Sequence, residues 1–196
     1  MTPRIHSSAA DELSALQIAQ FKHDEVYHRE IARLTVHARL NHMALHFCKY
    51  VGQLATALPY EDRLTIRRTV IDSFVIALSS ANTLNLKLDD AIPETKMAPS
   101  LAELGELLIR KDATHTDRYS NWLLVAFAKE AGEIARACEK LDHLEAFPFR
   151  ETIASSVIGI CRTSLVAATL YGFDIVKSIR ERFDEIEPKY LFHKIP

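Results

Sequence analysis

Two glutamates near the middle of the chain have the spacing that most clearly suggests chemistry. Glu130 and Glu133 lie in the segment Lys-Glu-Ala-Gly-Glu-Ile-Ala, which begins at Lys129. Residues three apart in a helix share one face, so the two carboxylates can converge on a common point. Converging carboxylates need a cation, and a divalent ion that prefers oxygen ligands, Mg²⁺ or Mn²⁺, fits best. An isolated pair of this kind is more often a solvated helix face, so the hypothesis depends on the surrounding sequence.

The surrounding sequence contains an internal repeat. Residues 41–55 align with residues 121–135 at an offset of 80, and five of these fifteen positions are identical. The next segments, 69–92 and 156–179, align at an offset of 87. Both blocks recur in the same order, which predicts two copies of a helical hairpin, at about 40–92 and 120–179. Two such hairpins can pack as a pseudo-two-fold four-helix bundle.

The elements that must position these residues are all expected to be helices. Only 5 glycines and 7 prolines occur in 196 residues, so the chain has little material for tight turns. We expect one all-α domain over residues 1–196, with extra helices at both ends of the bundle and a linker at about 86–100. The expected helices, with their start and stop residues, are an N-terminal helix through Phe21, 26–58 ended by Pro59, 61–84, 101–110 capped by Ser100 and Glu103, one from Asp117 or Ser120 through Cys138, 150–170 closed by Gly172, and 174–187.

Composition limits the classes of partner. The formal charge of −2 gives no electrostatic reason to bind a nucleic-acid polymer. The three cysteines, Cys48, Cys138 and Cys161, are far apart in apolar helical patterns, which is typical of small core residues in a reducing compartment. The N-terminus lacks an apolar signal region, and no uninterrupted apolar run approaches the length of a spanning helix. We therefore expect a cytoplasmic protein with no membrane partner.

The order of the motifs resembles a known family. The chain resembles the all-α nucleotide pyrophosphatases in the order of its motifs. These are a helix with Glu-x-x-Glu and an internal glycine, a turn, a second helix, a run such as Tyr-Gly-Phe-Asp at 171–174, and a final amphipathic helix. That superfamily includes MazG and the dimeric dUTPases, and the resemblance covers about residues 40–190. It implies a MazG-like bundle and Mg²⁺-dependent cleavage of a nucleoside triphosphate to the monophosphate and pyrophosphate. Separately, the apolar content of the N-terminal helix suggests pairing of two copies, and we expect a homodimer.

The resemblance assigns roles to particular residues. Glu130 and Glu133 match the metal-binding Glu-x-x-Glu, and Asp72 of the first repeat is the candidate third acid, in both metal binding and catalysis. Lys189 stands where the family often has a basic residue. The second helix of the second repeat has Ser156 and Gly159 where the family has two acids, and the first repeat has Tyr50 and Gln53 in place of its Glu-x-x-Glu. Triphosphate hydrolysis needs cations and an aligned water, so this incomplete set predicts weak turnover or binding without turnover.

Other residues are candidates on spacing alone. Lys49 and Lys129 precede glycines at equivalent repeat positions and are candidate phosphate contacts. His46 lies four residues from His42, a spacing that suits a transition metal, although a pocket-lining role is the simpler interpretation. The remaining clusters are interpreted as polar or ion-paired surface: Asp24 and Glu25 between His23 and His28, Glu103 with Glu106, and Arg67 with Arg68. The alternative function is a catalytically silent bundle that binds a nucleotide or a protein partner.

Overall fold

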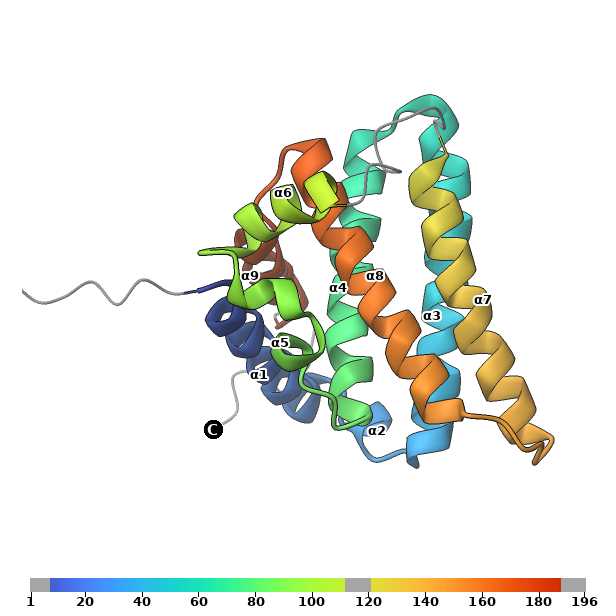
Figure 1. Ribbon diagram of the computed structural model, residues 1–196. Coiled ribbons are helices and arrows are strands. Elements are labelled where there is room, and N and C mark those ends of the chain that lie inside the picture. The colour runs from blue at the N-terminus through green and yellow to red at the C-terminus, as the bar shows by residue number, and fades with distance from the viewer. Residues whose placement is uncertain (1–7, 112–120, 188–196) are drawn as a thin grey trace, which may run out of the picture.

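Every element in the described part of the chain, residues 8–111 and 121–187 of a computed structural model, is a helix (Figure 1). The all-α prediction is therefore confirmed. In chain order the α-helices are α1 (Ala9–Tyr27), α2 (Arg29–Ala32), α3 (Val36–Ala57), α4 (Arg63–Thr83), α5 (Leu88–Ala91), α6 (Leu101–Lys111), α7 (Trp122–Asp142), α8 (Phe149–Tyr171) and α9 (Ile175–Ile186), with 3-10 turns at Leu58–Tyr60 and Pro93–Lys96.

Four long helices form two antiparallel hairpins that pack side by side. The α3–α4 hairpin turns at one end and the α7–α8 hairpin at the opposite end (Figure 1). Helix α3 lies against α4 and α7, and α8 lies against the same two helices. A second group, α1, α5, α6 and α9, covers the side of the bundle formed by α4 and α8. This arrangement places α1 and α9 beside the first hairpin, where a cavity forms.

Local capping chemistry fixes many helix ends. Thr35, Asp62 and Asp174 accept hydrogen bonds from backbone N–H groups in the first turns of α3, α4 and α9, each at 3.0–3.2 Å. Ser100 caps α6 in the predicted way, since the Glu103 N–H donates to its Oγ at 3.2 Å. Gly172 ends α8 with a φ of 72°, in the left-handed region that glycine adopts without strain. The predicted caps Ser100 and Gly172 are confirmed.

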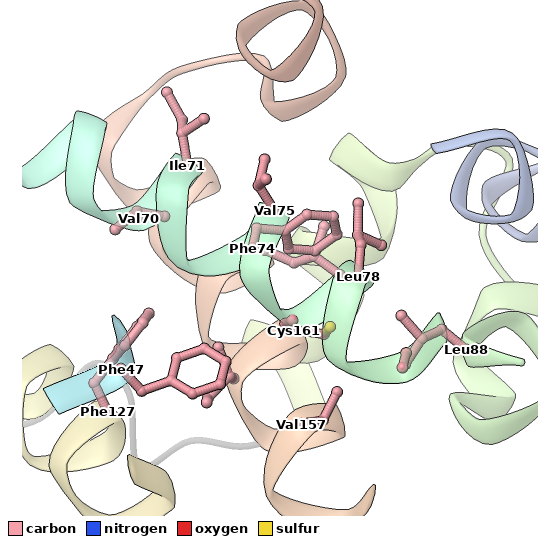
Figure 2. Close-up of a cluster of buried hydrophobic side chains, with 14 of the residues drawn as sticks. Phe47, Val70, Ile71, Phe74, Val75, Leu78, Leu88, Phe127, Val157 and Cys161 are labelled. Carbon is pink, nitrogen blue, oxygen red and sulfur yellow. The ribbon is translucent and has the colours of Figure 1, made fainter. Parts of the chain in front are cut away.

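The core is built from the inward faces of both hairpins. Figure 2 shows Phe47 of α3, Phe127 of α7, Phe74 of α4 and Cys161 of α8 in this cluster, and each of the four is at most 1% exposed. Burying one such aromatic side chain stabilises the fold by about 1.5–3 kcal/mol. Helix α8 is long and apolar enough to span a membrane by length and composition alone, but 61% of its 18-residue apolar stretch is buried inside the protein. Its apolar character is accounted for by its place in the core.

Helix α1 docks through buried apolar residues, Leu13 and Leu16 among them, and also through polar side chains. The Gln17 side chain donates to the Leu86 carbonyl at 2.6 Å and accepts from the Leu88 N–H at 3.2 Å. The Glu12 carboxylate accepts from the Leu101 N–H at 2.8 Å, which satisfies a free donor at the start of α6. These bonds hold α1 in one register against its neighbours, although its surface is not strongly amphipathic.

Two sequence predictions about the fold are wrong: the unbroken helix over 26–58 and the burial of Cys48. The helix expected over 26–58 is interrupted, because α1 ends at Tyr27 and α3 begins only at Val36. The expected linker at about 86–100 contains α5 and a 3-10 turn, and its Glu94 accepts two hydrogen bonds from Arg162 of α8, at 2.8 and 3.2 Å, which lower the Glu94 pKa to about 2. Cys48 is exposed, whereas Cys138 and Cys161 are buried as expected. The proposed start residues Asp117 and Ser120 lie outside the described residues, and α7 begins at Trp122.

Candidate functional site

The two glutamates of the Glu-x-x-Glu motif lie near the α7–α8 contact. The Glu130 side chain is 16% exposed, and its Oε1 is 3.2 Å from Lys129 Nζ. Its carboxyl group packs over Gly159 of α8, where an added Cβ would come within 2.7 Å of Glu130 Cδ. The Glu133 side chain is 38% exposed and forms an ion pair with Arg136. Each acid therefore has a basic partner from its own helix.

Asp72 belongs to a different neighbourhood. It projects from α4 toward α9, where Arg182 Nε donates to its Oδ1 at 2.6 Å and Nη2 donates to Oδ2 at 3.4 Å. Both side chains of this pair are 18% exposed. Asp72 lines a cavity to which neither Glu130 nor Glu133 contributes.

The three acids do not fit a shared Mg²⁺ site as they are placed. Mg²⁺ needs oxygen ligands around one point, and a carboxylate already bound by arginine or lysine loses that partner when it binds the ion. Asp72 is held by Arg182, Glu133 by Arg136 and Glu130 by Lys129. As placed, these residues do not support an Mg²⁺-dependent reaction step.

A cavity of about 190 Å³ between α1, α3, α4 and α9 is the best candidate for a functional site, because many ionisable side chains line it. It brings together three sequence-predicted residues, His46, Lys49 and Asp72. Its other polar lining residues include Gln20, His23, Asp24, His28, Arg39, His42, Tyr50, Ser79 and Arg182, and its apolar walls include Ile31, Met43, Val75 and Ile76. Four histidines, two acids and three strongly basic side chains thus surround one space.

On α3, the histidine pair is part of a short hydrogen-bonded row. His46 Nε2 is 3.1 Å from His42 Nε2, and His46 Nδ1 is 3.3 Å from the Tyr50 hydroxyl and 3.2 Å from Lys49 Nζ. Burial, with Lys49 adding to it, lowers the His46 pKa to about 4. Burial and the Asp72 charge raise the Tyr50 pKa. His46 and Tyr50 are therefore neutral near pH 7. Both His42 and His46 line the cavity, as the simpler interpretation of this pair predicted.

On the α1 side, His23 is buried and Asp24 is partly buried. His23 is 6% exposed, and burial is the main cause that lowers its pKa to about 4. Asp24 accepts hydrogen bonds from Ser79 at 2.6 Å and from Gln20 at 2.7 Å, but burial still raises its pKa. The interpretation of Asp24 as surface was wrong, because α1 turns this face toward α4.

The remaining candidates lie elsewhere. Lys129 pairs with Glu130, and Lys189 lies outside the described residues. Arg67 and Arg68 form the expected surface ion pairs, each 3.4 Å from Glu181 or Glu185 of α9. The sequence analysis missed Arg182 and Gln20 as lining residues. The only signal for them was a polar residue at an inward helix position, which a single sequence does not distinguish from an outward one.

Comparison with known proteins adds no family assignment. No protein-family model, curated protein or solved structure matches the chain.

Proposed function

We propose that this chain is a MazG-like helical protein that binds a nucleotide in the cavity between α1, α3, α4 and α9, without efficient turnover. The observation that carries the proposal is the lining of this cavity, where the cationic side chains of Lys49 and Arg39 lie near apolar walls. Cationic side chains bind phosphate oxygens, and apolar walls suit a base. The volume of about 190 Å³ is below the about 300–1,000 Å³ typical of pockets for drug-sized ligands, so it accommodates part of a nucleotide. Because Lys49 is exposed, it would bind the phosphates at the rim of the cavity.

The burial pattern of the two hairpins supports the MazG-like duplicated bundle within this proposal. At an offset of 80, Phe47 and Phe127 are both buried, as are Leu54 and Ile134. At an offset of 87, the same is true of further pairs along α4 and α8: Ile66 with Ile153, Val70 with Val157, and Leu78 with Leu165. Equivalent positions therefore face the core in both halves.

Pyrophosphate-releasing hydrolysis is the second candidate. The observation that favours it is the burial of Glu130 against α8, since a simple surface glutamate would point into water. The pairing of Glu130, Glu133 and Asp72 with basic side chains opposes it, because each acid would have to exchange its partner for a metal ion. Binding without turnover therefore ranks first.

The repeat supplies a matched pair of variants for the test. Lys49 and Lys129 occupy equivalent positions, but only Lys49 lines the cavity. A panel of nucleoside triphosphates with Mg²⁺ is added to the wild type and to Lys49→Gln and Lys129→Gln variants, and unfolding temperature and pyrophosphate are measured. Ligand at 100 times its Kd stabilises by about 2.7 kcal/mol, which is about 5–11 °C for a chain of this size. We expect this shift in the wild type and Lys129→Gln, and a much smaller one in Lys49→Gln.

Two results would change the conclusion. Binding in this cavity is contradicted if no nucleotide shifts the unfolding temperature of the wild type. It is also contradicted if both lysine variants lose the shift in unfolding temperature equally. Pyrophosphate release clearly above that of a Glu133→Gln control supports the hydrolase candidate instead.

We further propose a cytoplasmic homodimer. Ile18 and Phe21, three residues apart on α1, are 56% and 53% exposed, which leaves apolar surface for a second copy. Light scattering of the purified chain tests this, and a monomeric mass at micromolar concentration contradicts it.

A further inference from the structure

The end of α1 gathers three groups with metal-ligating atoms. His23, Asp24 and His28 each offer one ligand atom, and these atoms lie within 4.8 Å of one another. In an unbroken helix, the side chains of His23 and His28 would point in widely different directions from the helix axis. The chain instead leaves the helix at His28, with φ −131° and ψ 41°, and the two imidazole rings come to 5.5 Å between centroids. The interruption between α1 and α3 therefore creates the cluster.

His23 is the observation that points to a ligand. Although its side chain is almost completely buried, neither ring nitrogen has a hydrogen-bond partner among the described residues. A buried polar atom without a partner costs about 1–3 kcal/mol, so native structures rarely retain one without a reason. The ring stacks on Phe183 of α9, with centroids 4.5 Å apart. Stacking occupies the ring faces and leaves the in-plane nitrogen lone pairs free to bind an ion.

Asp24 is held as a ligand carboxylate usually is. Ser79 of α4 donates to one of its oxygens and Gln20 of α1 to the other, at 2.6 and 2.7 Å. Each oxygen keeps a further lone pair for a metal ion. Outer hydrogen bonds of this kind orient ligands and are worth about 10–100-fold in metal affinity. The two donors thus hold Asp24 beside His23.

We propose that His23, Asp24 and His28 form a binding site for a transition-metal ion such as Zn²⁺, open toward the cavity. Two imidazoles with one carboxylate suit Zn²⁺ and its neighbours, whereas Mg²⁺ prefers oxygen ligands alone. Tetrahedral Zn²⁺ with bonds of about 2.0–2.1 Å holds its ligands about 3.3 Å apart, so small side-chain rotations close the site. Three protein ligands leave one position for water or an anion, as in catalytic zinc sites. This site lines the same cavity as the proposed nucleotide site, but its argument does not use the nucleotide, and none of the three ligands belongs to the Glu130 region.

The experiment measures metal binding without nucleotide, so its outcome is separate from that of the proposed function. The full chain without a polyhistidine tag is treated with chelator, then titrated with Zn²⁺ by calorimetry and with Co²⁺ by visible absorption. We expect one ion per chain, a Co²⁺ spectrum of low coordination number and a rise in unfolding temperature. His23→Gln and His28→Gln are expected to weaken Zn²⁺ binding by about 100-fold or more, and Ser79→Ala by about 10-fold, because it removes only an outer hydrogen bond.

Matched controls separate this site from the other histidines. His42→Gln removes a cavity histidine outside the cluster, and His143→Gln removes an exposed one at the end of α7; both are expected to bind Zn²⁺ as the wild type does. Circular dichroism of the chelated variants checks folding, and the partly exposed His28 gives a test if His23→Gln misfolds. Absence of one-to-one binding overturns the proposal, as does wild-type affinity in His28→Gln or loss of binding in His42→Gln.

Discussion

Alanine is expected to have opposite effects at two helical glycines, Gly105 and Gly132. Gly105 lies where α6 crosses α8, and an added Cβ would be 2.1 Å from Thr169 Oγ1 and 2.9 Å from the Leu165 carbonyl oxygen. The threonine can rotate, but the carbonyl is main chain and moves only with α8. Gly132 on α7 has no atom within 4 Å of an added Cβ. The same substitution therefore meets a helix at one site and open space at the other.

The magnitude follows from two terms. Alanine in place of glycine favours a helix by about 1 kcal/mol at either site. Forcing extra volume into the α6–α8 contact costs about 1–3 kcal/mol. Gly132→Ala should therefore stabilise by about 1 kcal/mol, and Gly105→Ala should be neutral to destabilising by about 2 kcal/mol. Because the helix-propensity term is common to both, the difference between the variants measures the clash alone.

Urea unfolding followed by circular dichroism gives both free energies. For a chain of this size, a difference of about 1–3 kcal/mol corresponds to about 2–12 °C in unfolding temperature. If Gly105→Ala is as stable as Gly132→Ala, α6 does not approach α8 this closely in solution. The packing of the second helical group on the bundle would then be refuted.

Two further predictions concern the cavity. Arg182→Met leaves the largely buried Asp72 carboxylate without its partner, so the free energy of unfolding should fall by about 1–3 kcal/mol. Adding Asp72→Asn to the same chain should recover part of this loss. If urea unfolding shows equal stability for the single and double variants, the pairing is contradicted. In chelator, the free energy of unfolding should fall as pH decreases from about 6.5 to about 4, because unfolded His23 and His46 bind protons that the folded chain, with pKa values of about 4, does not. His23 contributes at most about 3 kcal/mol to this change in the free energy of unfolding. Urea titrations at several pH values should show a weaker pH dependence of that free energy in His23→Gln than in the wild type. An unchanged pH dependence would contradict a buried neutral His23.

Local signals in the sequence determined the helices and many of their ends. Ser100 with Glu103, Asp174 and Gly172 mark boundaries because their chemistry acts within one turn of the backbone. The interruption after Tyr27 escaped this reasoning, since the apolar spacing continues through it. Near this end of α1, His23 stacks on Phe183 of α9 and Asp24 binds Ser79 of α4, and both partners are distant in the sequence.

The candidate site was only partly predictable for the same reason. The spacing of Glu130 and Glu133 determines that they share a helix face, but not that Lys129, Arg136 and Gly159 meet them there. The sequence alone identified helices, caps and the apolar positions that fill the core, because these depend on neighbours a few residues away. The tertiary structure alone decided that Asp72 contacts Arg182, 110 residues further along, and that the ligand atoms of His23, Asp24 and His28 lie within 4.8 Å of one another. Contacts between distant segments depend on how whole helices pack, and the pattern of one helix does not contain that information.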